Sequence, residues 1–147
     1  KKKNVLNCQY CYFIDKPYNR ITEMNYFSDK TSPKDENILS MEISCHLNDK
    51  MWNLSEKETF DLCMKSVQKD GILKIDEVVD YKVLKVPNVY PIYRKDYNNY
   101  LAEVNAFIDK TKNFYSIGRL GQFYYGDIDQ MARFGFDTAT EIISKKN

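Results

Sequence analysis

Residues 116–129 are Ser116-Ile117-Gly118-Arg119-Leu120-Gly121-Gln122-Phe123-Tyr124-Tyr125-Gly126-Asp127-Ile128-Asp129, a stretch that gathers glycine, arginine, aromatic and carboxylate side chains. The aromatic and β-branched run at 114–117 predicts a short strand where the stretch begins. The glycines permit positive φ and close backbone approach, and helical spacing of apolar residues begins at Ile128. The stretch therefore predicts a strand, a glycine-rich turn and a final helix.

A helix that begins near Ile128 would direct unpaired backbone N–H groups and the positive end of its dipole at this turn. Such an end favours an anionic or carbonyl-bearing ligand, although any turn from strand to helix can use glycine. The apolar face of the helix comprises Ile128, Met131, Ala132, Gly135, Ala139, Ile142 and Ile143. Because glycine costs about 1 kcal/mol of helix propensity relative to alanine, we expect a close packing neighbour at Gly135.

The segment Gly118-Arg119-Leu120-Gly121, followed by Phe123, Tyr125 and Asp129, resembles a motif of FAD-dependent proteins. These proteins belong to the superfamily of UDP-galactopyranose mutase, protoporphyrinogen oxidase and flavin amine oxidase. In them the motif lies near the C-terminus and contacts the flavin. The mutase pattern, Gly-Arg-Leu-(Ala/Gly)-x-(Tyr/Phe)-(Lys/Arg)-Tyr-x-x-Met-Asp, is the most similar. Tyr124 replaces its basic residue and Ile128 its methionine. The resemblance implies that Gly118, Arg119, Gly121 and Asp129 contact the FAD cofactor.

Two other segments extend the resemblance. Pro17-Tyr18-Asn19-Arg20-Ile21-Thr22-Glu23 resembles the mutase strand whose arginine lies near the reactive edge of the flavin, which implies a cofactor contact for Arg20. Tyr90-Pro91-Ile92 resembles a Tyr-Pro-(Ile/Val) segment, which implies that Tyr90, together with Tyr125, binds the diphosphate of a sugar nucleotide. Each residue also has a purely structural alternative. Arg20 could be a surface arginine, and Tyr90 and Tyr125 could serve only in packing. Asp129 could be favoured at its position by the helix dipole alone.

Composition excludes several classes of protein. The chain has 147 residues, of which 43% are hydrophobic, so it suits one domain or part of a larger one with a packed core. A formal net charge of +1 gives no general attraction to nucleic acid or to an acidic membrane. No apolar run approaches the ~20 residues that span a bilayer, and we expect a cytoplasmic protein.

Cys8 and Cys11 form a C-x-x-C motif, which suggests either a zinc site or a redox pair. If 5–14 is a strand, however, an odd separation places the two thiols on opposite faces of the sheet. There is no second C-x-x-C, and His46 is the only histidine. We therefore expect buried free thiols and no metal ligands, and we assign no catalytic residue.

The remaining pattern predicts an α+β fold, with a mixed, mostly antiparallel sheet and three or four packing helices. Strands are predicted at 5–14, 20–27, 39–45 and 81–86, helices at 55–71, 74–79 and 97–110, and an edge or lining segment at 87–93. We expect a single unit, in which 1–95 resembles the substrate domain and 96–147 is the C-terminal flavin-contacting segment.

No G-x-G-x-x-G unit for the FAD nucleotide is present in these residues, and the first residue is not methionine. We therefore expect a C-terminal fragment whose main partner is a missing N-terminal dinucleotide-binding half. The complete enzyme is expected to act on a sugar nucleotide in surface-polysaccharide biosynthesis, whereas the fragment alone neither retains FAD nor has activity. The alternatives are an amine-oxidase-like or protoporphyrinogen-oxidase-like flavoenzyme and a non-catalytic interaction module that has lost the cofactor.

Overall fold

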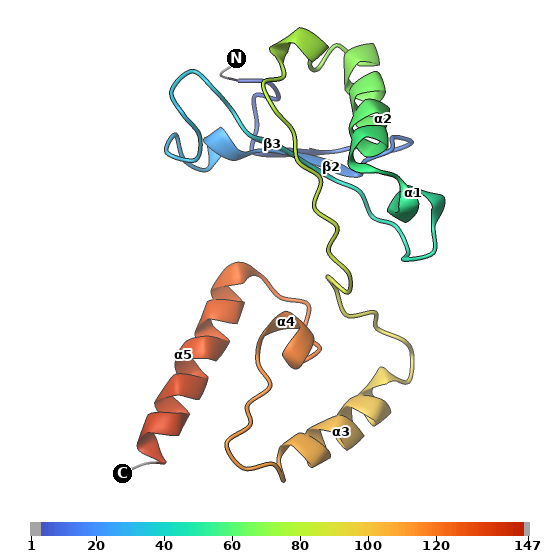
Figure 1. Cartoon of the computed structure of the whole chain (residues 1–147). Helices are drawn as coiled ribbons and strands as arrows, with labels where there is room; N and C mark the ends of the chain where they lie inside the picture. Colours follow the sequence, from blue (N-terminus) through green and yellow to red (C-terminus); the bar gives the residue numbers. More distant parts are fainter. Residues whose placement is uncertain (1–3, 146–147) are drawn as a thin grey trace. The chain divides into compact units, whose positions relative to one another are not determined.

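A computed structural model of the chain describes residues 4–145 (Figure 1). The chain divides into two compact units, Lys1–Lys85 and Val86–Asn147. Its combination of an antiparallel sheet with helices confirms the predicted α+β class. The second unit contains Tyr90 and the glycine-rich stretch, whereas Arg20, the other residue expected to contact the cofactor, belongs to the first unit.

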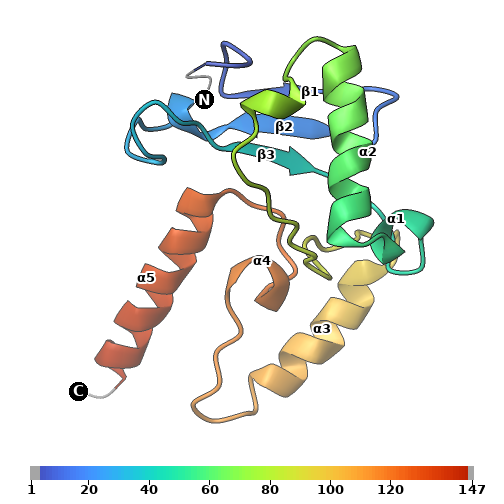
Figure 2. The same cartoon turned by 45° about the horizontal axis from the view of Figure 1, so that its top comes forward.

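The first unit is built on a three-stranded antiparallel sheet with the order β1-β2-β3 (Figure 2). The strands are β1 (Tyr10–Tyr12), β2 (Arg20–Glu23) and β3 (Leu39–Glu42), each shorter than the alternating sequence pattern predicts. In the middle of the sheet Ile21 pairs with Cys11 on one side and with Met41 on the other. After β2 the chain turns into the 3-10 helix η1 (Met24–Tyr26) instead of extending the strand.

The main helix of this unit is α2 (Glu56–Lys69), and its start is set by the predicted capping box. Ser55 Oγ accepts the Glu58 backbone N–H at 3.2 Å, while the Glu58 carboxylate accepts the Ser55 backbone N–H at 2.8 Å. Two short elements flank α2, namely α1 (Lys50–Asn53) and the 3-10 helix η2 (Ile75–Glu77).

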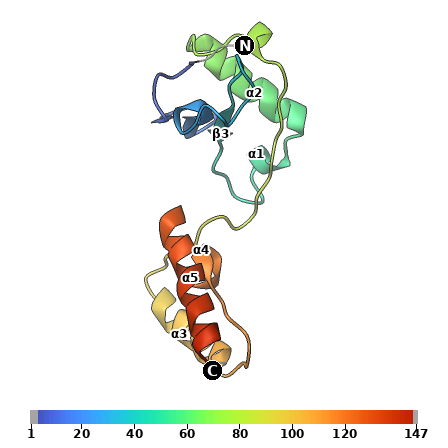
Figure 3. The same cartoon turned by 90° about the vertical axis from the view of Figure 1, so that its left-hand side faces the viewer.

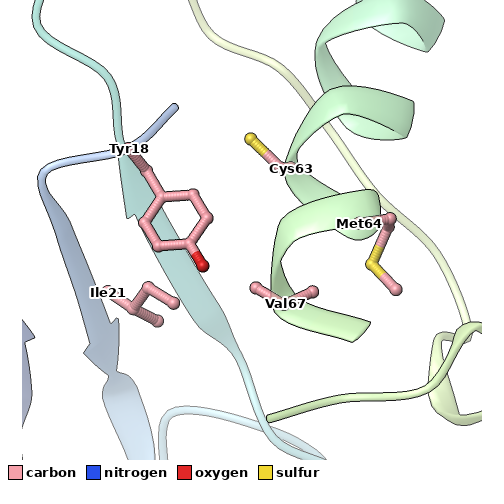
Figure 4. Close-up of a cluster of buried hydrophobic side chains, with 5 residues drawn as sticks. All are labelled: Tyr18, Ile21, Cys63, Met64 and Val67. Carbon is pink, nitrogen blue, oxygen red and sulfur yellow. The ribbon is translucent and has the colours of Figure 1, made fainter. Parts of the chain in front are cut away.

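The core lies between the sheet and α2 (Figure 4). Tyr18 and Ile21 approach from the sheet side, and Figure 4 shows them facing the helix that carries Cys63, Met64 and Val67. Ile21 and Val67 are fully buried at 0% exposure. The Tyr18 hydroxyl donates to Ser66 Oγ at 3.4 Å, so its polar end is satisfied at the edge of the core.

A fully buried carboxylate, that of Glu23, ties the segment before β1 to the sheet. Its oxygens accept the backbone N–H groups of Val5 at 2.9 Å and Leu6 at 2.6 Å, and also the side-chain amide of Asn37 at 2.5 Å. The segment is bent at Asn7, whose φ is 56°. Strand 5–14 is therefore wrong as predicted, and so is the placement of Cys8 and Cys11 on opposite faces of a strand.

The second unit contains α3 (Tyr97–Ile108), α4 (Gly118–Gly121) and α5 (Ile128–Ser144), and α4 lies beside α5 (Figure 3). The predicted helices near 97–110 and from Ile128 are both present. None of the residues in these three helices is buried. A Cβ at Gly135 would meet no atom within 4 Å, so the packing neighbour expected there is not found. The apolar face of α5 is therefore not buried within the described residues.

Two predicted strands are wrong. Residues 81–86 and 114–117 are irregular, and neither run pairs with a strand in the described part of the chain. The glycine-rich turn that follows 114–117 contains a single helical turn, α4. Within residues 4–145, no helix combines the length and the apolar character that crossing a bilayer requires.

Candidate functional site

The centre of the candidate site is the side chain of Arg119, in α4. Its guanidinium carbon lies 4.8 Å from the ring centroid of Tyr90 and 5.3 Å from that of Tyr125. The two rings are themselves 5.2 Å apart and inclined at 51°. We call Tyr90, Arg119 and Tyr125 the arginine–tyrosine cluster. It joins three of the residues for which the resemblance implies a role, and both tyrosines are exposed.

One hydrogen bond fixes the direction of the guanidinium, since Arg119 Nη2 donates to the Gly126 carbonyl oxygen at 2.6 Å. Gly126 is buried, and a Cβ there would lie 2.5 Å from the Tyr124 ring and 2.7 Å from Gln130 Oε1. A larger residue at 126 would require the Tyr124 ring and the Gln130 side chain to move. The glycine therefore permits this packing beside the carbonyl group that Arg119 binds.

The turn that carries Arg119 begins at Gly118, whose φ of 83° lies in the left-handed region that favours glycine. Gly121 ends the turn, and its carbonyl oxygen accepts a hydrogen bond from Ser116 Oγ at 2.8 Å. Both predicted cofactor glycines thus shape the backbone around Arg119. A direct contact between either glycine and a flavin stays a prediction.

Tyr93 was not among the predicted site residues, yet it holds Tyr125 in place. Its hydroxyl oxygen accepts the Tyr125 backbone N–H at 2.7 Å and donates to the Phe123 carbonyl oxygen at 3.2 Å. Its ring also packs edge-to-face on Phe123, with centroids 5.7 Å apart. The only hint in the sequence is that Tyr93 closes the Tyr-Pro-Ile-Tyr segment, which brings a second tyrosine close to Tyr90.

Asp129 lies on α5, the helix that follows Tyr125 in the chain. It is exposed in the first turn of α5 and lines an open hollow of about 430 Å³ together with Tyr124, Gln130, Arg133 and Phe134. No hydrogen bond or ion pair joins Asp129 to Arg119 in the part of the chain that the structure describes. Its position suits a carboxylate near the positive end of the helix dipole, and its cofactor role stays a prediction.

Arg20 lies on β2 of the first unit, where it pairs across the sheet with Glu42. Its Nε and Nη2 donate to Glu42 Oε1 at 2.9 and 2.5 Å, and its Nη1 donates to the Tyr12 hydroxyl at 3.2 Å. The hydrogen bond with Glu42 raises the pKa of Arg20 further above its usual value. Because its charge is already balanced, Arg20 is less available to an anionic ligand than Arg119 is.

Arg119 differs from Arg20 in its electrostatic surroundings. Among residues 4–145, no carboxylate forms an ion pair with Arg119. The tyrosine rings attract its charge but leave guanidinium N–H groups to donate to another molecule. The cluster therefore offers one unneutralised cation and two phenol hydroxyls to a ligand. This is a donor set for phosphate or for a carbonyl-rich ring.

The structure provides no comparable arrangement for a metal, because no group of three or more His, Cys, Asp or Glu side chains within residues 4–145 is placed to hold one. Comparison with known proteins gives no match, since no family model, curated protein or solved structure is similar to the chain. The flavoprotein interpretation therefore rests on the residues themselves and on their geometry.

Proposed function

We propose that this chain supplies the flavin- and diphosphate-contacting C-terminal part of a cytoplasmic FAD-dependent enzyme. The enzyme would act on a sugar nucleotide in surface-polysaccharide biosynthesis. The observation that carries the proposal is the position of the Arg119 guanidinium against the rings of both Tyr90 and Tyr125, without an ion-pair partner among residues 4–145.

The donor chemistry of the cluster supports this ligand class. A guanidinium donates along its planar edge to two oxygens at once, which suits a phosphate group or the carbonyl groups of an isoalloxazine ring. Neutral phenols donate to phosphate oxygens without adding a further charge to the site. Tyr90 and Tyr125 would accordingly hold the diphosphate, and Arg119 would orient the ligand.

The remainder of the FAD site is expected outside these 147 residues, because the sequence has no G-x-G-x-x-G unit for the pyrophosphate. We expect the purified chain to be colourless and inactive by itself. The coding sequence upstream of Lys1 provides a first test. An in-frame G-x-G-x-x-G unit there supports the proposal, and a start codon directly upstream of Lys1 opposes it.

The reaction class is tested on the complete protein. Reduced FAD supplies the nucleophilic chemistry at the anomeric carbon of the sugar, while the residues of this chain bind and orient the sugar nucleotide. We expect turnover of UDP-galactopyranose after reduction with dithionite and none in the oxidised protein. Peroxide formation from an amine or a porphyrinogen, with no turnover of the sugar nucleotide, would instead favour an oxidase of the same superfamily.

A second candidate is a non-catalytic interaction module. The observation in its favour is the uncovered apolar surface of α5, where Ile128 is 86% exposed and Phe136 is 73% exposed. This surface could pack against a separate partner protein, or equally against the remainder of a flavoenzyme. A complete protein that remains colourless when it is supplied with FAD supports the module and rejects the enzyme.

A further inference from the structure

The two cysteines of the C-x-x-C motif lie side by side. Cys8 Sγ and Cys11 Sγ are 3.0 Å apart, within hydrogen-bonding range of each other, and both residues are free thiols. Both are also partly exposed to solvent, so the expectation that these thiols are buried is wrong. The pair is therefore accessible to a reagent and close enough for one sulfur to reach the other with little movement.

The first unit holds both residues in this arrangement. Cys11 is fixed in β1 opposite the fully buried Ile21. Cys8 follows the bend at Asn7, and the buried Glu23 carboxylate holds the segment before it through the backbone N–H groups of Val5 and Leu6. The Glu23 backbone N–H also donates to the Gln9 carbonyl oxygen at 2.8 Å. Hydrogen bonds on both sides of Cys8 thus hold its position beside β1.

We propose that Cys8 and Cys11 are a redox site that closes reversibly to a disulfide by exchange with a low-molecular-weight disulfide such as oxidised glutathione. One protein thiolate attacks a glutathione sulfur, forms a mixed disulfide and releases the first glutathione thiolate. The second protein thiolate then attacks the protein sulfur of that mixed disulfide and releases the second glutathione. The protein loses two electrons and two protons, and the glutathione disulfide is reduced to two thiols.

The geometry selects this pair among the four cysteines. Cys63 lies on α2 and is buried in the core, so its thiol is shielded from a dissolved disulfide. Cys45 is partly exposed, but no second thiol lies within hydrogen-bonding range of it in the described residues. Within residues 4–145, no third metal-binding side chain completes a cluster with Cys8 and Cys11. Thiol exchange is therefore the chemistry that the pair supports.

The surroundings of Cys8 affect the rate of thiol–disulfide exchange through the pKa of its thiol. Its hydrogen bond with Cys11, followed by desolvation and the negative charges of Cys11 and Glu23, raises the pKa of the Cys8 thiol above its ordinary value. The reactive thiolate is accordingly scarce at neutral pH. We expect disulfide formation to become faster as the pH rises through the alkaline range.

The test uses the purified chain in glutathione buffers that range from fully reduced to mostly oxidised. Free thiols are trapped with iodoacetamide at each ratio, and the trypsin fragment 4–20, which contains Cys8 and Cys11 and neither of the other cysteines, is analysed by mass spectrometry. We expect its doubly alkylated form to fall about tenfold or more across the series. It should be replaced by an unalkylated fragment whose mass is two hydrogen atoms less than that of the reduced fragment, as a disulfide requires.

Variants identify the bond. Cys45→Ser should leave the transition unchanged, whereas Cys8→Ser and Cys11→Ser should each abolish the form that is lighter by two hydrogens. In each of these two variants the remaining thiol should carry a glutathione or stay free to alkylate. Full alkylation of fragment 4–20 at every glutathione ratio, or a disulfide from Cys8 or Cys11 to Cys45, would overturn the proposal. The result is independent of whether the complete protein binds FAD.

Discussion

The guanidinium of Arg119 lies 4.8 Å from the ring of Tyr90, although Tyr90 precedes α3 in the sequence and Arg119 follows it. Tyr125 completes the arrangement from the loop before α5. A positive charge that is held by two phenol rings and lacks a carboxylate partner in residues 4–145 is arranged to meet a negative or carbonyl-rich ligand.

The tyrosine hydroxyls should contribute to the affinity for a sugar nucleotide. In the complete protein, Tyr90→Phe and Tyr125→Phe should each weaken UDP binding about tenfold, because a hydrogen bond to a charged group is removed while the ring remains. Tyr100→Phe, at an exposed tyrosine of α3, is the matched control and should bind as the wild type does. Isothermal titration measures the three affinities. Equal affinity in all variants would show that the cluster does not contact the diphosphate.

The core of the first unit should depend on Ile21. Because this side chain is fully buried between the sheet and α2, Ile21→Ala leaves a cavity and should lower the free energy of unfolding by about 2 to 5 kcal/mol. Ile14→Ala is the matched control, since Ile14 is 85% exposed, and it should have little effect. Urea unfolding monitored by circular dichroism tests both variants. A similar loss in both would contradict the assignment of the core.

The Glu23 carboxylate should be necessary for the conformation of the segment before β1. Glu23→Gln places an amide, which is partly a donor, against the N–H groups of Val5 and Leu6, and should destabilise the unit by about 1 to 3 kcal/mol. Hydrogen exchange at the Val5 and Leu6 amides should become faster. Glu36→Gln serves as the control, because its carboxylate makes no hydrogen bond or ion pair within residues 4–145. Unchanged exchange in Glu23→Gln would refute this anchoring role.

The capping box of α2 should make stability depend on acid pH. Hydrogen bonds from the Ser55 side chain and backbone lower the pKa of Glu58. A carboxylate whose pKa is lowered by folding stabilises the fold above its unfolded pKa, and this contribution is lost as the pH falls through the folded pKa. Ser55→Ala should lower the free energy of unfolding by about 1 kcal/mol at neutral pH. The difference in stability between wild type and variant should shrink as the pH falls through the folded pKa of Glu58. A difference that stays constant from neutral to acid pH would argue against the coupling.

Local rules predicted the helices that carry their own start signals. The capping box of Ser55 and Glu58 located the start of α2, and the apolar spacing from Ile128 located α5. Both depend on residues within a few positions of each other, so the sequence contains the necessary information.

Two strand predictions were wrong because a strand also requires a neighbouring strand with which to form hydrogen bonds. Residues 81–86 and 114–117 have β-branched and aromatic side chains, but strand propensity needs a neighbouring strand, which these runs lack within residues 4–145. The proximity of Cys8 to Cys11 was missed for a different reason. It depends on the left-handed conformation of Asn7 and on the buried Glu23, neither of which periodicity reveals.

The candidate site was predictable only in part. The motif identified Arg119 and Tyr125, and the Tyr-Pro-Ile segment identified Tyr90, but their meeting depends on contacts between distant segments. Tyr93 bridges Phe123 and Tyr125 through its hydroxyl, a link that no spacing rule suggests. Asp129 was expected to contact the cofactor because it matches an aspartate of the family motif, and in the structure it lines the hollow beside Tyr124 and Arg133.

The flavin content of the complete protein tests the central claim most directly. After it is supplied with FAD, the wild type should show the visible absorbance of bound flavin, and Arg119→Ala should bind FAD about tenfold or more weakly because it lacks a charged donor. Arg94→Ala, which removes an exposed arginine of the same unit, should bind FAD as the wild type does. A colourless wild type, or an Arg119→Ala protein that retains FAD with undiminished affinity, would contradict the account.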